Sequence, residues 1–231
     1  AMKNIKPPVY EKNGEFWLGG WDSPLNTIED YRLAADMGLN YMFIDPSTIP
    51  SEYEKTFEYC KQSGINAIFS LGNEPLPRDD LDPSKLPGLK ALNYYDEPSY
   101  DNIAKVAERF DYHMERFGST LMAYANLNPS YAPVETICGS ELAAQKGDKA
   151  QVTAADYKRY VEKYATDALD KITSGRKVLS YDHYPILFER GNYYNRPAWL
   201  TDTATIVNTA KAHNAEPHVF IQALEHLGIY P

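Results

Sequence analysis

Short apolar runs alternate along the chain with longer amphipathic stretches, and this alternation predicts strands that are each followed by a helix. The runs are rich in aromatic and β-branched residues, whereas the stretches between them repeat apolar positions every three or four residues. The first four runs recur about every 25 residues, which is the spacing of a strand-loop-helix-loop unit. Seven strands are predicted, beginning near residues 16, 41, 66, 90, 120, 177 and 218.

Local capping signals place the helices between these strands. Thr27 with Asp30, and Thr153 with Asp156, have the spacing of a capping box, in which each side chain bonds to the other residue's backbone N–H. Glycines follow three of the amphipathic stretches and predict where those helices end. The predicted helices cover 27–39, 50–64, 99–118, 153–175 and 201–215.

The order of these elements predicts an α/β fold with parallel strands. No G-x-G-x-x-G sequence follows a strand, so a dinucleotide-binding fold has no support. Polar or aromatic residues follow every predicted strand. This favours a TIM (β/α)8 barrel, in which all strand ends surround one centre, over an open sheet, which needs polar groups at only one switch point. These residues are Trp21, Asp22, Asp45, Asn73, Glu74, Asp96, Glu97, Asn126, Asn128, Asp182, His183, Tyr184, Gln222, Glu225 and His226.

The predicted barrel is incomplete, because seven strands are present and the eighth βα unit is absent from this chain. An eighth strand with its helices needs roughly another 50 residues at the observed spacing. We therefore expect a single barrel domain over residues 1–231. Two alternatives stay open: the chain is a fragment of a longer protein, or a second chain closes the barrel.

Composition excludes several classes of function. A net charge of −9 argues against a nucleic-acid partner, which requires a clustered basic face. No apolar run is long enough to predict a membrane span. Cys60 and Cys138 lack the spacing of a zinc site, and no cofactor is predicted. The chain has 19 tyrosines, which suit stacking on sugar rings but are equally common in the interior of large barrels.

Carboxylates at the strand ends suggest glycoside cleavage. That reaction needs one carboxylic acid to protonate the leaving oxygen and one carboxylate to attack or to activate water. Glu97 is the predicted acid, because Asp96 beside it raises its pKa by like-charge repulsion. Glu225 is the first candidate for its partner, although strand alternation gives it the opposite parity from Gln222. Asp182 is the alternative partner, and both stereochemical outcomes stay open.

The motifs at these positions resemble those of the clan A glycoside hydrolases, a superfamily of (β/α)8 barrels. By resemblance, Glu97 after strand four matches the acid/base glutamate and Glu225 after strand seven matches the nucleophile. That family usually has Asn-Glu where this chain has Asp96-Glu97. The Asn-Glu-Pro at 73–75 follows strand three, which is the wrong strand.

A closer resemblance is to bacterial barrels grouped with the glycoside hydrolases. It rests on three motifs and implies hydrolysis of an oligo- or polysaccharide, with a periplasmic or secreted location. The motifs are Asp96-Glu97-Pro98-Ser99, Asp182-His183-Tyr184-Pro185 and Gln222-Ala223.

The other strand-end residues are predicted to bind a carbohydrate substrate, with Trp21 as a stacking floor. A barrel that binds glycans without cleaving them is the main alternative function. A metal-dependent sugar isomerase or aldolase-type barrel is a weaker one, because no paired histidine spacing supports a metal site. The predicted substrate-binding residues are Trp21, Asp22, Asp45, Asp96, Asn126, Asn128, His183, Tyr184 and Gln222.

Overall fold

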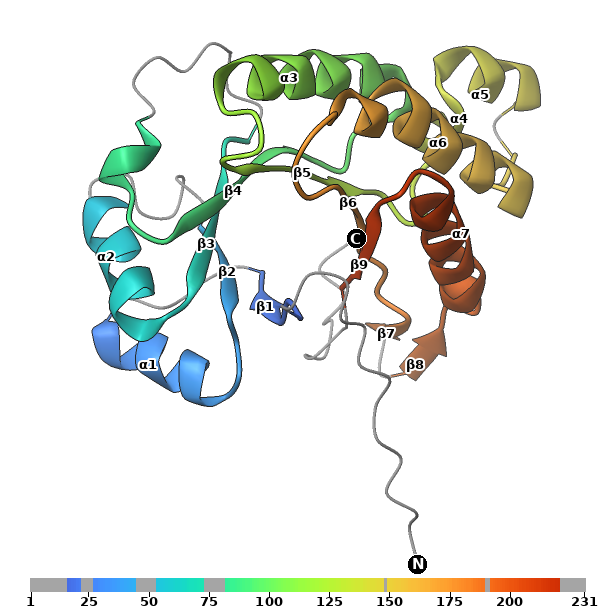
Figure 1. The fold of residues 1–231 in the computed structure, drawn as a ribbon. Helices are drawn as coiled ribbons and strands as arrows, with labels where there is room; N and C mark the ends of the chain where they lie inside the picture. Colours follow the sequence, from blue (N-terminus) through green and yellow to red (C-terminus); the bar gives the residue numbers. More distant parts are fainter. Residues whose placement is uncertain are drawn as a thin grey trace, which may run out of the picture. The chain divides into compact units, whose positions relative to one another are not determined.

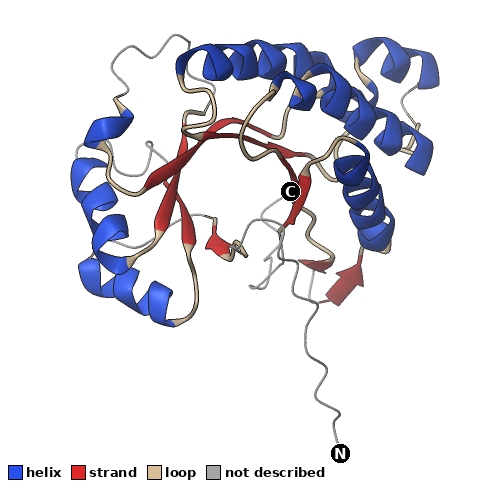
Figure 2. Cartoon of the chain, viewed as in Figure 1, coloured by secondary structure: helices blue, strands red, loops and turns tan. Residues whose placement is uncertain are grey.

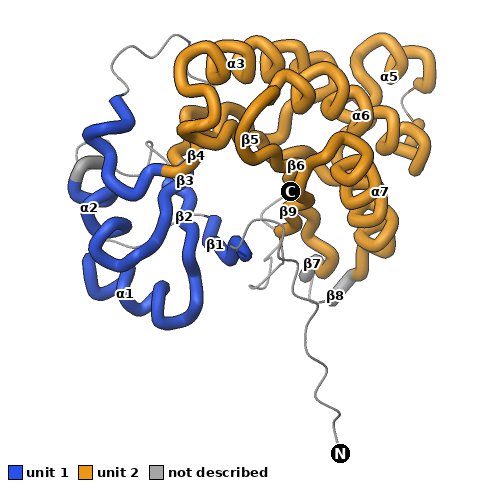
Figure 3. Tube along the Cα trace, viewed as in Figure 1, with its two compact units in different colours: residues 1–68, 82–89 blue, residues 69–81, 90–231 orange. Residues whose placement is uncertain are grey.

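The chain divides into two compact units in the computed structural model (Figure 3). Unit 1 comprises residues 1–68 and 82–89, and unit 2 comprises 69–81 and 90–231. The structure describes residues 16–21, 27–44, 53–72, 82–147, 149–189 and 192–220.

The seven predicted strands are all present, and they form one seven-stranded sheet (Figures 1 and 2). The pairings of β1 with β2, β4 with β5, β5 with β6 and β6 with β9 are parallel. A parallel α/β fold is therefore confirmed, whereas the (β/α)8 barrel stays a prediction. In sheet order the strands are β1 Gly19–Gly20, β2 Tyr41–Ile44, β3 Asn66–Ser70, β4 Leu89–Asp96, β5 Met122–Leu127, β6 Val178–Tyr181 and β9 Glu216–Val219.

The five predicted helices are also present, with their capping signals where these are described. Both capping boxes form: Thr27 with Asp30 begins α1, and Thr153 with Asp156 begins α6. Gly64 follows the last turn of α2 with a positive φ of 77°, which an L side chain rarely adopts. These helices are α1 Ile28–Asp36, α2 Tyr53–Ser63, α3 Ile103–Arg116, α6 Ala154–Asp167 and α7 Ala198–Ala212.

Two regions for which the sequence predicts no helix or strand contain regular structure. The polar stretch after β5 holds two short helices, α4 Val134–Cys138 and α5 Ser140–Lys146. The tyrosine-rich segment after β6 forms a hairpin of two antiparallel strands, β7 Ile186–Glu189 and β8 Asn192–Asn195. Three short 3₁₀ helices complete the description: η1 Pro83–Lys85, η2 Tyr100–Asn102 and η3 Leu169–Lys171.

Tyrosine fills the core of unit 2. Helices α3, α6 and α7 pack against one another and against β5, β6 and β9 (Figure 2). Six tyrosine side chains of this unit are fully buried, so they are structural groups and not platforms for sugar. The high tyrosine count thus reflects core packing to a large extent. The buried rings are Tyr94, Tyr124, Tyr157, Tyr160, Tyr164 and Tyr181.

In unit 1, β2 is buried throughout and forms the centre of the packing. Trp17 stacks on Tyr41, and Trp21, which directly follows β1, packs against Phe43 with ring centroids 4.2 Å apart. Trp21 keeps 37% of its surface exposed. Within the described part of the chain, no helix is both long and apolar enough to cross a membrane.

Candidate active site

Three neighbouring strands of unit 2 bring polar side chains together at their carboxyl ends. Asp96 at the end of β4 pairs in register with Asn126 of β5, and Asn126 pairs with Ser180 of β6. Neighbouring strands lie about 4.8 Å apart, so residues at one level of a parallel sheet are within reach of each other. Asp182 lies two residues beyond Ser180 and belongs to the same face.

A chain of hydrogen bonds fixes the orientation of the Asn126 amide. The Tyr124 hydroxyl donates to Ser180 Oγ at 2.6 Å, and Ser180 Oγ donates to Asn126 Oδ1 at 2.9 Å. Since its oxygen already accepts this bond, the amide directs its NH2 group at the two carboxylates. Asn126 Nδ2 donates to Asp182 Oδ1 at 3.2 Å and to Asp96 Oδ1 at 3.3 Å.

Glu97 has an unusual backbone conformation directly after β4. Its φ is 53°, in the left-handed region that non-glycine residues adopt rarely and at a cost. Its N–H donates to the Asn126 carbonyl at 2.8 Å, and the next residue, Pro98, is buried. The Pro98 carbonyl accepts hydrogen bonds from the Tyr160 hydroxyl at 2.6 Å and from Asn128 Nδ2 at 3.2 Å. The surrounding structure therefore holds Glu97 in this conformation.

The pKa of the Glu97 carboxyl group is raised to near neutral pH. Withdrawal from water, followed by the negative charges of Asp182 and Asp96, raises the pKa of Glu97 to about 7. The residue as a whole keeps exposed surface, so this carboxyl group stays accessible to a ligand. A glutamic acid that is protonated at neutral pH and accessible has the property a general acid requires.

Asp182 is the second carboxyl group of the cluster, and it is 7% exposed. Burial raises its pKa, while hydrogen bonds from Tyr184 and Asn126 oppose that rise. These donors stabilise the charged form of Asp182 within the same cluster that favours the protonated form of Glu97. Burial thus raises the pKa of both carboxyl groups, and of the two only Asp182 has hydrogen-bond donors among the described residues that oppose the rise.

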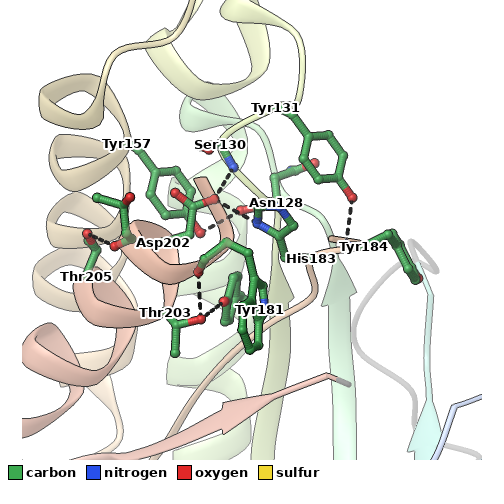
Figure 4. Close-up of polar contacts among 12 residues, drawn as sticks. Asn128, Ser130, Tyr131, Tyr157, Tyr181, His183, Tyr184, Asp202, Thr203 and Thr205 are labelled. Carbon is green, nitrogen blue, oxygen red and sulfur yellow. Dashed lines mark hydrogen bonds and ion pairs between the residues drawn. The ribbon is translucent and has the colours of Figure 1, made fainter. Parts of the chain in front are cut away.

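A buried histidine–aspartate pair, His183 with Asp202, involves the residue that follows Asp182 in the chain (Figure 4). His183 Nδ1 is 3.0 Å from Asp202 Oδ2, and both side chains are almost completely buried. The Ser130 N–H donates to the same Asp202 oxygen at 3.0 Å. His183 Nε2 is also buried, and it has no hydrogen-bond partner among the described residues. This pair joins α7 to the segment that carries Asp182 and Tyr184.

Tyr131 forms a further wall of the cluster, on the loop after β5. Its hydroxyl accepts a hydrogen bond from the Tyr184 N–H at 3.2 Å, and its ring meets the His183 ring edge-on at 4.9 Å (Figure 4). The Arg196 guanidinium lies over the Tyr131 ring, 3.7 Å from the ring centroid.

The sequence analysis does not predict several residues of this site, among them Asp202, Tyr131 and Arg196. Asp202 carried a usable signal, because it lies on the apolar stripe of α7 with Ile206 and Ala210, where a carboxylate needs a partner. Tyr131 and Arg196 carried none, since their positions depend on contacts between distant segments.

The structure brings together seven of the predicted site residues, in two groups. Glu97, Asp182, Asp96, Asn126 and Tyr184 form the carboxylate cluster. Asn128 and His183 lie behind it: Asn128 donates to the Pro98 carbonyl and His183 bonds to Asp202. The Asp96 carboxylate accepts a hydrogen bond from Asn126.

The remaining predicted residues cannot be added to this cluster. Trp21 belongs to unit 1 and packs on Phe43. The other four predicted residues lie outside the described residues. So does His226, which with His183, Asp45 and Asp182 would be a candidate ligand in the metal-dependent alternative. The four predicted residues are Asp22, Asp45, Gln222 and Glu225.

The described residues contain no group of three or more His, Cys, Asp or Glu side chains placed to hold a metal ion. Fold and site together define a parallel α/β protein with a cluster of carboxyl groups at the carboxyl ends of β4, β5 and β6. Comparison with models of protein families and with curated proteins found no match for this chain.

Proposed function

We propose that this protein is a glycoside hydrolase with a TIM-type barrel, in which Glu97 is the general acid and Asp182 is its carboxylate partner. The observation that carries the proposal is the raised pKa of Glu97, about 7, in a cluster with a hydrogen-bonded Asp182. A carboxyl group whose pKa is raised to near neutral, beside a second carboxyl group that accepts hydrogen bonds from Tyr184 and Asn126, is an arrangement suited to glycoside cleavage. The resemblance of the Asp-Glu-Pro-Ser and Asp-x-Tyr-Pro motifs supports the same assignment.

The chemistry divides between the two groups. Glu97 transfers its proton to the glycosidic oxygen as the bond from that oxygen to the anomeric carbon breaks, and the leaving sugar departs as an alcohol. Asp182 accepts a proton from the water that adds to the anomeric carbon. Asn126 and Tyr184 hold the Asp182 carboxylate in position for that transfer. Net reaction is the addition of one water across the glycosidic bond.

The test compares Glu97→Gln with wild type on a panel of glycans and on aryl glycosides. Loss of a general acid slows cleavage of natural glycosides by about 100-fold or more, because their leaving alcohols require protonation. Dinitrophenyl glycosides leave without protonation, so the variant should cleave these at a rate close to that of wild type. Glu162→Gln, a change on the exposed face of α6, is the matched control and should behave as wild type.

Equal loss on both classes of substrate would contradict the acid role of Glu97, and unchanged cleavage of glycans would refute it outright. Binding of glycans by the wild-type protein without any product would favour the non-catalytic alternative. Calorimetry run beside the product assay separates these results.

A further inference from the structure

The β7–β8 hairpin places an arginine beside the candidate active site. Ile186 pairs with Asn195 in this antiparallel hairpin, so the chain returns to the point where it left β6. The Arg196 N–H then donates to the Pro185 carbonyl at 2.8 Å. Arg196 is thereby anchored to the segment from Asp182 to Pro185.

The Arg196 side chain is held flat against an aromatic ring. Its guanidinium lies 3.7 Å from the centroid of the Tyr131 ring, and the Tyr131 hydroxyl accepts from the Tyr184 N–H. The charges of Arg196, Asp182 and Glu97 all act on the Tyr131 hydroxyl. The cation and the two carboxyl groups therefore lie within electrostatic reach of the same hydroxyl group.

Arg196 differs from the other half-buried arginines of unit 2 because its side-chain N–H groups have no acceptor among the described residues. Arg109 donates to the Gly72 and Tyr94 carbonyls, Arg159 to the Cys138 carbonyl, and Arg176 to Glu216. No hydrogen bond or ion pair from the Arg196 side chain is found in the described part of the chain. Stacking occupies its face and leaves its edge, with the planar fork of N–H donors, available.

We propose that Arg196 binds the carboxylate of an acidic sugar, so that the substrate of this site is a uronic-acid glycoside. The guanidinium fork matches a planar carboxylate with two parallel hydrogen bonds. A substrate carboxylate that enters beside Asp182 and Glu97 meets repulsion, and Arg196 supplies the cation that offsets it. That the bound sugar is also cleaved rests on the proposed function, whereas its binding does not.

The experiment measures binding to the Glu97→Gln protein, in which turnover does not interfere. The probes are oligosaccharides of galacturonic, glucuronic and mannuronic acid, each paired with its carboxyl-reduced, neutral counterpart. We expect an acidic oligosaccharide to bind about tenfold or more tightly than its reduced form, because a charge-assisted bidentate contact is lost on reduction. Higher salt should narrow this ratio only partly, since the site is half-buried.

Three further variants isolate the role of the guanidinium. Arg196→Met keeps an apolar group over Tyr131 and should bring the ratio to about one, while Arg196→Lys keeps the charge and should retain part of it. Arg116→Met is the control, because Arg116 also stacks on aromatic rings but lies on α3 away from the site. It should leave the ratio unchanged.

The inference is overturned if no acidic oligosaccharide binds, if reduced forms bind equally well, or if Arg196→Met keeps the preference. Binding of acidic sugars by a wild-type protein that releases no product would uphold this inference while refuting hydrolysis. Cleavage of neutral glycans alone would do the reverse.

Discussion

Two carboxyl groups of unit 2, those of Asp156 and Glu97, have opposite electrostatic environments. At the start of α6, burial raises the pKa of Asp156, but hydrogen bonds from Thr153 and Lys146 outweigh this and hold it at about 2. At the end of β4, burial and neighbouring anions raise the pKa of Glu97 to about 7, and no hydrogen bond to its carboxylate is found among the described residues. A carboxylate that stabilises the fold is supplied with donors, whereas the candidate acid is surrounded by charge of its own sign.

The same contrast separates two buried histidines of unit 2, His113 and His183. His113 has both ring nitrogens engaged, Nδ1 with the Tyr94 hydroxyl at 3.0 Å and Nε2 with the Leu121 carbonyl at 2.9 Å. His183 has only Nδ1 engaged, with Asp202. Of these two histidines, the one beside the carboxylate cluster is the one with a ring nitrogen that no described residue satisfies.

The variant with the largest expected effect, Asp182→Asn, tests whether the carboxylate cluster of Glu97 and Asp182 is catalytic. Asp182→Asn should lower kcat on any glycan that the protein cleaves by about 100-fold or more, because the proton acceptor is removed while its size is kept. KM should change little, since the substrate contacts remain. Steady-state kinetics on the glycan identified for wild type supply the measurement.

Asp111→Asn, on the exposed surface of α3, is the control for Asp182→Asn and should leave kcat unchanged. If Asp182→Asn kept wild-type kcat, the partner of Glu97 would have to be another carboxylate, and Glu225 would be the next to test.

A smaller effect, on stability, tests the buried pair behind the cluster. Asp202→Ala should lower the free energy of unfolding by about 3 kcal/mol, because it leaves His183 buried without a partner and removes the acceptor of the Ser130 N–H. Asp202→Asn keeps an acceptor and should cost less. Urea unfolding of the three proteins gives the comparison.

Equal stability of Asp202→Ala and wild type would show that the pair contributes nothing to the fold. The ring of His183 would then have to be held by its packing against Tyr131 and Tyr181 alone.

The local parts of this contrast could be predicted from sequence, and the long-range parts could not. Thr153 and Asp156 are three residues apart, so their capping box is encoded in a single turn, and it is found as expected. Asp96 and Glu97 were placed correctly at the end of a strand by the alternation of apolar and polar runs. In both cases the informative residues are neighbours in the chain.

The contacts that define the site join residues far apart in the chain. Asn126 reaches Asp182 because β5 and β6 are paired in one particular register, which apolar runs do not specify. Arg196 reaches Tyr131 only through the β7–β8 hairpin, where the tyrosine-rich segment was expected to be a loop. Ile186–Glu189 and Asn192–Asn195 do not alternate apolar and polar residues, so the period-2 pattern that predicts a strand is missing there.

Asp156→Ala tests the carboxylate whose charge is stabilised by hydrogen-bond donors. We expect a loss of about 1–2 kcal/mol at pH 7, because the capping box at the start of α6 and the contact with Lys146 are both removed. A depressed pKa stabilises the fold above the unfolded value of 3.8 and loses that contribution as pH falls toward about 2. The difference between variant and wild type should therefore shrink over that range, as followed by urea unfolding.

The smallest effect is the pH dependence of stability that Glu97 itself contributes. Its folded pKa of about 7 exceeds the ordinary value of 4.5, so the folded protein binds this proton more tightly than the unfolded chain does. Stability from Glu97 is complete below pH 4.5 and is lost as the pH rises through 7. Glu97→Gln stays uncharged, so its melting temperature should decline less than that of wild type between these values. The partial exposure of Glu97 keeps the effect small. Parallel melting curves of the two proteins supply the measurement. If the melting temperature of wild type declined less than that of Glu97→Gln, the pKa of Glu97 would be lowered like that of Asp156, and the acid role would lose its physical basis.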